Sequence, residues 1–254
     1  SCGRCVNCAA GRTNACQQLR WIGCDPSGAL PGAMAGEFLA PASSLYPVPD
    51  DVTDEQAVLV EPLATPVHAV RIAGDLTDGR VAVIGAGTIG LFCVIAAKRA
   101  GAGTVVVSDL DPGKRERALR HGADVAIEAG GDVAAAAQAA LGGPADAVFD
   151  CVATEGSARS AVSLLRHAGT LLVVGVPAGD FALPMPLVQD WELRVQGCAN
   201  YTAADVQVAL AMARTIPAPE IIAGRFPLAR AAEAFERAAM PSAGKVVLTT
   251  AGED

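Results

Sequence analysis

Residues 80–90 read Arg-Val-Ala-Val-Ile-Gly-Ala-Gly-Thr-Ile-Gly, a short apolar run followed at once by three spaced glycines. The valines and isoleucine of 80–84 favour a buried strand, and the apolar residues from 91 to about 100 predict a helix. The pattern G-x-G-x-x-G between a strand and a helix forms the turn that holds a dinucleotide. This stretch therefore predicts the first β–turn–α unit of a nucleotide-binding domain.

Each glycine of this turn has a separate physical task. Gly85 permits the tight bend, Gly87 lets a pyrophosphate approach the backbone, and Gly90 lets the helix pack on the strand. The phosphates would lie against the first helical turn, at Thr88 and Ile89, where N–H groups and the helix dipole favour negative charge. We expect these five residues to bind the cofactor.

The next apolar segment, 104–108, ends at Asp109, about 22 residues after the middle glycine. A carboxylate at this place accepts both ribose hydroxyls of NAD and repels the 2′-phosphate of NADP. Asp111 precedes Pro112 and fits the helix-cap role better, which leaves Asp109 for the ribose. Lys114 and Arg115 follow closely and would suit a phosphate, so the sequence favours NAD while leaving NADP open.

Strands and helices continue to alternate along the chain. The sequence predicts helices over 112–120, 132–141 and 156–167, and strands over 124–127, 147–150, 170–174 and 193–197. Continuous apolar strands joined by helices are typical of an α/β fold with a doubly wound parallel sheet, here of about six strands. His121 and His167 each lie shortly before a glycine, so we interpret both as helix ends rather than catalytic groups.

Four cysteines lie within the first sixteen residues. Cys2, Cys5, Cys8 and Cys16 have the spacing C-x2-C-x2-C-x7-C, and four thiolates this close can surround one tetrahedral zinc ion. Protein would fill all four positions of such a site, so the zinc would be structural. A disulfide pair or an iron–sulfur cluster would use the same residues and is the alternative.

The composition favours a cytoplasmic protein. No secretion signal precedes the cysteines, and no apolar run approaches the roughly 20 residues that span a bilayer. The net charge of −8 argues against nucleic acid or an anionic membrane as partner.

The two ends of the chain differ from the middle. Residues 1–60 are rich in Gly, Pro and Ser, with β-like runs at 37–40 and 45–48 and a helix beginning near Thr53. Beyond residue 202 the patterns predict helices over 203–214 and 228–238 and a closing strand over 245–250. We therefore expect a nucleotide domain, 63–202, inserted between the two pieces of a second domain, 1–62 and 203–254.

Five features resemble, in the same order along the chain, those of zinc-containing medium-chain alcohol dehydrogenases. They are the cysteine cluster, Val-Glu-Pro-Leu-Ala at 60–64, the glycine turn, Asp109, and the ending Phe-Pro-Leu at 226–228 with Gly-Lys-Val-Val at 244–247. The nearest branches are the polyol (sorbitol-type) and threonine dehydrogenases. The resemblance implies a Rossmann-type domain inserted in a partial, mainly β (GroES-like) catalytic domain. Members also carry, before the cysteine loop, a zinc-binding cysteine and a His-Glu pair, whereas this chain starts after that segment.

The resemblance also assigns roles to single residues. In the polyol branch the glutamate at the position of Glu61 lies at the catalytic zinc, directly or through water. Chemistry alone leaves open that Glu61 only stabilises a helix start. Gly175 and Val176, after a strand, are expected to line the nicotinamide side of the crevice. Polyol dehydrogenases typically read Gly-x-Phe-Arg-Tyr where this chain has Asn200 before Tyr201, which argues against sorbitol itself.

The implied activity is that of a zinc-dependent oxidoreductase. It would transfer hydride from a secondary alcohol or polyol-like small molecule to NAD, giving a ketone. Family members associate through their sixth strands, so we expect a homodimer or homotetramer. Two other classes stay open: a non-catalytic NAD-binding protein with a structural zinc, and a zinc-independent NADPH-dependent enone or quinone reductase.

Overall fold

The computed structural model describes residues 1–24, 27–240 and 244–250. The chain forms two compact units: Glu61–Tyr201, here called the nucleotide unit, and Ser1–Val60 with Thr202–Asp254, here called the flanking unit. The nucleotide unit thus begins two residues before the predicted position 63 and ends one residue before 202. Residues 251–254 of the predicted last segment lie outside the described residues.

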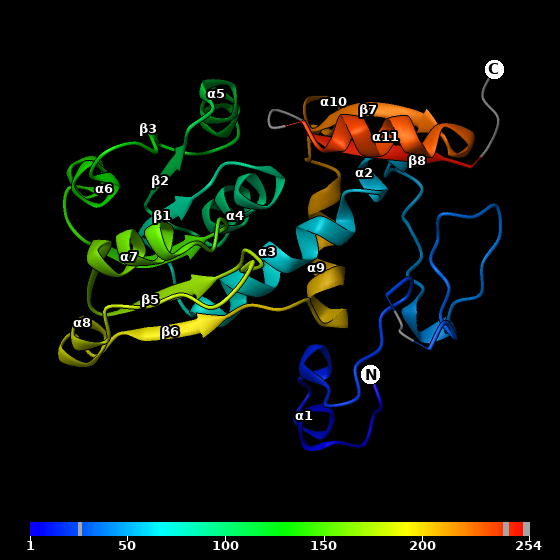
Figure 1. Cartoon of the computed structure of the whole chain (residues 1–254), viewed down its shortest axis with the longest axis horizontal. Coiled ribbons are helices and arrows are strands. Elements are labelled where there is room, and N and C mark those ends of the chain that lie inside the picture. Colours follow the sequence, from blue (N-terminus) through cyan, green and yellow to red (C-terminus); the bar gives the residue numbers. More distant parts are fainter. Residues whose placement is uncertain (25–26, 241–243, 251–254) are drawn as a thin grey trace. The chain divides into compact units, whose positions relative to one another are not determined.

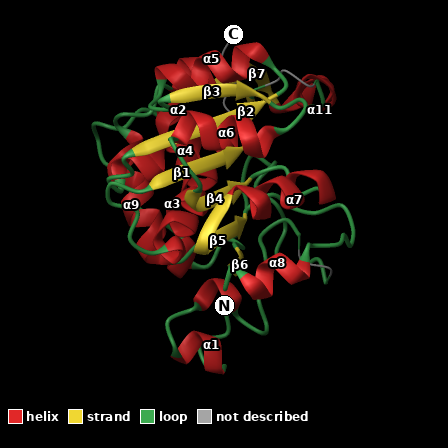
Figure 2. Ribbon diagram, turned by 90° about the vertical axis from the view of Figure 1, so that its left-hand side faces the viewer, coloured by secondary structure: helices red, strands yellow, loops and turns green. Residues whose placement is uncertain are grey.

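The nucleotide unit is built on a six-stranded sheet in the order β3-β2-β1-β4-β5-β6, in which every neighbouring pair is parallel (Figure 2). The chain runs outward from β1 to β3 and then returns to β4 beside β1. The order in which the chain adds strands therefore reverses between β1 and β4, which confirms the predicted doubly wound α/β fold. The strands are β1 (Arg80–Ile84), β2 (Thr104–Asp109), β3 (Val125–Glu128), β4 (Ala145–Asp150), β5 (Leu165–Val173) and β6 (Arg194–Gly197).

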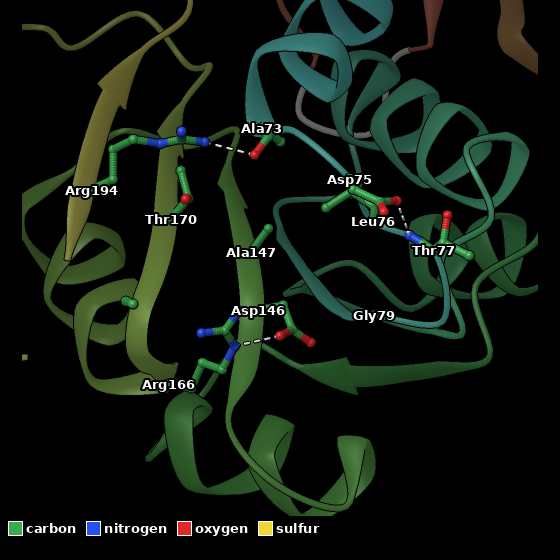
Figure 3. A pocket seen from close by; sticks show the side chains of 11 residues that line it. Ala73, Asp75, Leu76, Thr77, Gly79, Asp146, Ala147, Arg166, Thr170 and Arg194 are labelled. Atoms are coloured by element: carbon green, nitrogen blue, oxygen red, sulfur yellow. Dashed lines mark hydrogen bonds and ion pairs between the residues drawn. The ribbon is translucent and has the colours of Figure 1, made fainter. Parts of the chain in front are cut away.

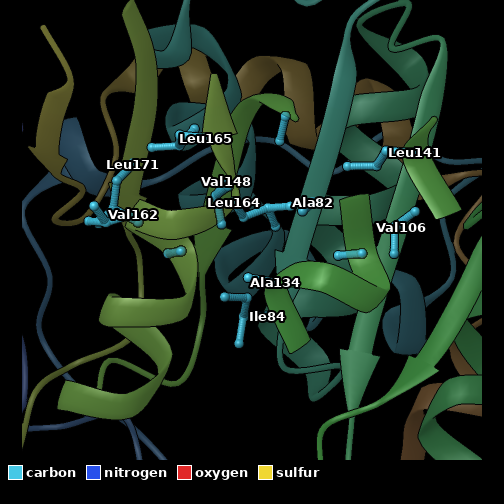
Figure 4. Packing of buried hydrophobic residues seen from close by; sticks show 13 residues of the cluster. Ala82, Ile84, Val106, Ala134, Leu141, Val148, Val162, Leu164, Leu165 and Leu171 are labelled. Atoms are coloured by element: carbon cyan, nitrogen blue, oxygen red, sulfur yellow. The ribbon is translucent and has the colours of Figure 1, made fainter. Parts of the chain in front are cut away.

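Helices connect these strands and bury their alternating side chains. Ile84, Val106 and Val148 lie in one buried cluster with Ala134 and Leu141 of the helix between β3 and β4 (Figure 4). Fully apolar strands need such cover on both faces, because the alternating side chains point both ways. The helices are α3 (Val60–Ala73), α4 (Thr88–Arg99), α5 (Pro112–Arg120), α6 (Val133–Leu141), α7 (Glu155–Leu164) and α8 (Met185–Asp190).

Polar caps fix where three of these helices begin. The Asp111 carboxylate accepts hydrogen bonds from the N–H groups of Gly113 and Lys114, which confirms that Asp111 caps α5. Asp132 caps α6 in the same way, and Thr154 begins α7 with a capping box.

The predicted helix over 156–167 is wrong in its last turn. Helix α7 ends at Leu164, and the backbone of Leu165 is already extended at φ −71° and ψ 146°, as the first residue of β5. Leu164 and Leu165 are both buried, and Leu165 pairs with Ala145 of β4, so burial and strand pairing outweigh helix propensity here. His167 consequently lies in β5 and stacks on Trp191, with 5.2 Å between ring centroids, whereas His121 does form the C-cap of α5.

The flanking unit contains short elements and one two-stranded parallel sheet (Figure 1). The predicted helix start is confirmed by a capping box at Thr53. The β-like runs at 37–40 and 45–48 form no strand, and exposed side chains such as Leu39 show that these segments have no buried face. The elements are α1 (Val6–Ala9), η1 (Thr13–Ala15), η2 (Ala42–Ser44), α2 (Asp54–Ala57), α9 (Ala203–Ala213), α10 (Ala218–Ile221), β7 (Ile222–Pro227), η3 (Leu228–Arg230), α11 (Ala231–Ala238) and β8 (Lys245–Thr249).

Candidate functional site

The glycine turn follows β1, at the point where the strand order reverses and β1 lies beside β4. Gly85 has a φ of +91°, a left-handed conformation that glycine adopts without strain. A Cβ on Gly85 would lie 2.8 Å from Cγ2 of Val152, which follows β4. The first glycine is therefore required both by the backbone angle and by the neighbouring turn.

The other two glycines have opposite surroundings. A Cβ on Gly90 would lie 1.7 Å from the carbonyl oxygen of Gly85, so any side chain there would force the helix off the turn. A Cβ on Gly87 would meet no atom within 4 Å. The space beside Gly87 is what a pyrophosphate needs to reach the backbone.

The first turn of α4 is open to an anion. Gly87 is the N-cap residue, and no side chain caps the helix. Thr88 and Ile89 are half-buried beside it. Because the first N–H groups of a helix have no partner inside the helix, this uncapped turn fits a bound phosphate.

The Asp109 carboxylate lies at the carboxyl end of β2 and is bonded to the glycine turn. Its Oδ2 accepts a hydrogen bond from the Ala86 N–H at 2.7 Å, and its Oδ1 accepts one from the Asp111 N–H at 2.9 Å. Each oxygen keeps a second lone pair for a ligand hydroxyl. Nη1 of the nearby Arg115 donates to the carbonyl oxygens of Asp109 and Leu110, so this guanidinium binds the backbone at the strand end.

Sequence reasoning missed Asp150, which holds the opposite side of the crevice. Its fully buried carboxylate accepts hydrogen bonds from the N–H groups of Val152 and Ala153 at 3.0 and 2.9 Å and from the Ser157 hydroxyl at 2.9 Å. These bonds hold Ala153 at a φ of +56°. The available signal was the same as for Asp109: an acidic residue that ends a buried parallel strand.

Gly175 packs directly against this turn. Its N–H donates to the carbonyl oxygen of Asp150, and a Cβ on Gly175 would lie 2.9 Å from both Cβ of Ala153 and the carbonyl carbon of Cys151. Val176 is 92 % exposed. The two residues thus follow β5 at the carboxyl edge of the sheet, the edge at which ligands of such sheets bind.

The four clustered cysteines fit a zinc ion. Their sulfur atoms all lie within 4.8 Å of one another, and those of Cys5 and Cys16 are 4.0 Å apart. A tetrahedral site with zinc–sulfur bonds of about 2.3 Å would place sulfurs about 3.8 Å apart. Helix α1 and the turn η1 bring the thiols together, with Gly3 and Gly11 at positive φ in the loops.

Neighbouring groups set the protonation of these thiols. N–H groups, first that of Cys8, lower the pKa of Cys5 to about 6, and those of Arg4 and Cys5 lower the pKa of Cys2. Desolvation and the adjacent thiols raise the pKa of Cys8 to about 11. Because zinc binds the thiolate form, metal binding at these thiols would release protons.

Glu61 lies in the first turn of α3 with an exposed side chain. Its Oε1 accepts a hydrogen bond from the Tyr201 hydroxyl at 3.1 Å. Asn200 has a φ of +58°, which asparagine tolerates better than most residues, and His68 is buried and bonded to Arg71. Within the described ranges only the cysteine cluster gathers three or more metal-ligating groups, so Glu61 is a single carboxylate rather than a complete metal site.

A hollow of about 310 Å³ lies at the opposite edge of the same sheet (Figure 3). It is lined at the amino ends of the strands by Asp146, Arg166, Thr170 and Arg194. Arg166 donates to the Asp146 carboxylate, and Arg194 donates to the carbonyl oxygens of Ile72 and Ala73. Since nucleotides bind at the carboxyl ends of parallel strands, this hollow is not the cofactor site.

A parallel sheet whose strand order reverses beside an open glycine turn is the architecture of dehydrogenases that bind a nicotinamide dinucleotide, and the four clustered thiols could hold a zinc ion. Residues 88–215 match the family model described as zinc-binding dehydrogenase. The chain belongs to this family, in its medium-chain polyol dehydrogenase branch.

Curated relatives and a solved structure that resemble this chain are dehydrogenases. Sorbitol dehydrogenase of Gallus gallus is 31 % identical over 246 residues, 95 % of this chain and 68 % of that protein. L-galactonate-5-dehydrogenase of Escherichia coli strain K12 is 34 % identical over 242 residues, 93 % of this chain and 69 % of that protein. A zinc-binding dehydrogenase of Sinorhizobium meliloti 1021, solved bound to NADP, is 29 % identical with a TM-score of 0.87, over 98 % of this chain and 74 % of its own. The chain thus spans about two thirds to three quarters of these proteins. No helix in the part of the chain that the structure describes is long and apolar enough to cross a membrane.

Proposed function

We propose that this chain belongs to a zinc-dependent oxidoreductase that transfers hydride from a secondary alcohol or polyol-like substrate to NAD, giving a ketone. The names of both curated relatives support this substrate class, because sorbitol and galactonate are polyhydroxy compounds. When bound, the nicotinamide supplies the hydride acceptor. The protein's own part is to hold the dinucleotide across the glycine turn and to orient it toward the substrate.

The position of the Asp109 carboxylate is the observation that favours NAD over NADP. Its hydrogen bond to Ala86 holds a negative charge at the glycine turn, where the adenosine ribose would lie. A 2′-phosphate would be repelled by that charge, whereas a ribose hydroxyl would donate to it. One solved relative holds NADP, so the choice depends on such residues rather than on the fold.

Titrating the protein with NAD and NADP tests the proposal. We expect the wild type to bind NAD roughly a hundredfold more tightly, and Asp109→Asn to lose most of that ratio, since a repulsive charge is worth a few kcal/mol. Asp111→Asn is the matched control, because Asp111 caps α5 and should leave the ratio unchanged. Equal affinity of the wild type for both nucleotides would overturn the NAD proposal.

Two zinc ions fit the proposal in different ways. The thiols of Cys2, Cys5, Cys8 and Cys16 would hold a structural ion, since all four positions are protein ligands. A second ion beside Glu61 would activate the substrate hydroxyl when bound. The chain's own contribution there is the Glu61 carboxylate, which Tyr201 orients.

We also propose that two copies associate through β6. This strand forms the edge of the sheet, and all four of its residues are exposed. An unpaired edge strand tends to pair with another chain, and an antiparallel pair of β6 strands would satisfy a two-fold axis. Light scattering should show a homodimer or homotetramer that Val195→Lys dissociates; a wild-type monomer would contradict this.

Zinc-binding thiols require reducing surroundings, which supports a cytoplasmic location.

A further inference from the structure

Two thiols from distant parts of the chain meet behind the glycine turn. Cys93 is the sixth residue of α4, and Cys151 directly follows β4. Their sulfur atoms lie 3.7 Å apart, although 58 positions separate them in the sequence. A disulfide has an S–S distance of about 2.05 Å, so the sulfurs must approach by about 1.7 Å to bond.

The two thiols differ in access. Cys93 is fully buried, whereas Cys151 is partly exposed, so an oxidant in solution meets Cys151 first. The contact with Cys151 and burial raise the pKa of Cys93, which keeps Cys93 a neutral thiol. Its S–H can then donate a hydrogen bond to the Cys151 sulfur.

Cys151 is also part of the nucleotide crevice. Its N–H donates to the carbonyl oxygen of Ile84 at 2.9 Å, directly before the glycine turn. A Cβ on Gly85 would lie 3.7 Å from Cβ of Cys151, and one on Gly175 would lie 2.9 Å from its carbonyl carbon. Because the turn packs tightly against both glycines, Cys151 has little room to move without displacing one of these loops.

We propose that Cys93 and Cys151 are a redox-sensitive dithiol, which a peroxide converts to a disulfide that weakens nucleotide binding. The Cys151 sulfur attacks one peroxide oxygen, the O–O bond breaks, and the Cys151 thiol becomes a sulfenic acid while the other oxygen leaves as water. The Cys93 sulfur then attacks the Cys151 sulfur, the S–O bond breaks, and a second water leaves with the Cys93 proton. In total, two thiols lose two electrons and one peroxide gains them.

The direction of the effect follows from the geometry. The disulfide would draw Cys151 and α4 together, and because Cys151 packs against the loops of Gly85 and Gly175, this movement would disturb both sides of the crevice. Bound nucleotide must in turn oppose disulfide formation, because coupling between two sites is reciprocal.

Peptide mapping of the zinc-loaded protein tests the disulfide without any nucleotide. After hydrogen peroxide treatment and alkylation, mass spectrometry should find the peptides of Cys93 and Cys151 joined, lighter by two hydrogens than the separate thiols. Dithiothreitol should reverse the link. Oxidation that joins only other cysteines, or that drives Cys151 to a sulfinic acid with no link to Cys93, would overturn the proposal.

Variants and a binding measurement complete the test. Cys93→Ala should leave a Cys151 sulfenic acid that dimedone traps, whereas Cys198→Ala, a change at a third cysteine of the same unit, should keep the link. The oxidised wild type should bind NAD at least about tenfold more weakly than the reduced protein, and saturating NAD should slow the link. Unchanged affinity after complete disulfide formation would overturn the regulatory half. This half rests on the proposed function, whereas the mapping does not, so the two can fail separately.

Discussion

The Tyr201 hydroxyl donates a hydrogen bond of 3.1 Å to the Glu61 carboxylate, although 140 positions separate the two residues. Glu61 is the first residue of the nucleotide unit and Tyr201 the last. The contact orients an otherwise exposed carboxylate that the proposed function places at the catalytic metal.

Tyr201→Phe should lower kcat/KM of the enzyme about ten- to a hundredfold, because a hydrogen bond to a charged group contributes about 1.5–3 kcal/mol. Steady-state kinetics with a polyol substrate and NAD measure this. Tyr46→Phe is the control, since Tyr46 lies in the flanking unit outside the proposed site. Wild-type kinetics in Tyr201→Phe would show that Glu61 needs no such partner.

Alanine at Gly90 and at Gly87 should have opposite effects. Gly90→Ala puts a methyl group against the Gly85 carbonyl oxygen and should cost about 3 kcal/mol of unfolding free energy or more. Gly87→Ala has open space and an ordinary φ of −61°, so its stability should stay within about 0.5 kcal/mol of wild type. Its NAD affinity should nevertheless fall, because the methyl group takes the place of a pyrophosphate oxygen. Urea unfolding measures the stability of both variants, and NAD titration measures their affinity. Equal losses of stability in Gly90→Ala and Gly87→Ala would contradict the separate roles of the two glycines.

Asp150→Ala should destabilise the protein by about 2–4 kcal/mol, because it leaves the N–H groups of Val152 and Ala153 without their acceptor. Ser157→Ala removes only a hydroxyl that donates to the same carboxylate and should cost about 1 kcal/mol. Thermal unfolding of both variants provides the comparison. A smaller loss in Asp150→Ala than in Ser157→Ala would mean that the turn does not depend on this carboxylate.

Cys16→Ser should remove the structural zinc. The Cys16 thiol is buried, accepts hydrogen bonds from the N–H groups of Cys2 and Gln18, and is one of the four thiols of the cluster. Metal analysis should find one zinc fewer per chain, while NAD titration should show an intact nucleotide site, because the cysteines lie in the other unit. Cys24→Ser changes an exposed thiol outside the cluster and should lose no metal. Full zinc content in Cys16→Ser would contradict the assignment.

The pair of Asp146 and Arg166 should contribute to acid stability. Burial would raise the pKa of Asp146, but hydrogen bonds from Arg166 and from the Arg80 N–H outweigh it, and the pKa is lowered. The unfolded chain, with an aspartate pKa of about 3.9, therefore binds the proton more tightly. The stabilisation is present above that pH and is lost as the pH falls through the lowered value.

Asp146→Asn should accordingly be less stable than wild type at pH 7 and lose less stability on acidification. Urea midpoints measured between pH 7 and pH 2 would show the two curves converging. Asp180→Asn, in an exposed loop, should follow the wild-type curve. Parallel curves for Asp146→Asn and the wild type would rule out this contribution.

Local patterns were enough to predict the parts of the fold that depend on one short segment. The glycine turn, the Asp111 cap and the strands β1 and β2 each carry their signal within a few residues. The cysteine cluster is of the same kind, because its spacing alone brings the thiols together.

The features that sequence reasoning missed depend on distant partners. Leu165 extends because Ala145 offers it a strand, and β7 exists because β8 pairs with it. Nothing near Cys93 in the sequence indicates Cys151, since only the complete fold brings α4 next to the residue that follows β4. Such contacts follow from the complete fold rather than from propensity.

The contact between Glu61 and Tyr201 also shows that the two ends of the nucleotide unit lie close together. A segment whose first and last side chains touch can be excised, circularly permuted or transplanted with a short linker, because joining its ends costs little loop-closure entropy. Residues 61–201 are therefore suited to circular permutation, with a linker that joins the two ends and a new start in an exposed loop.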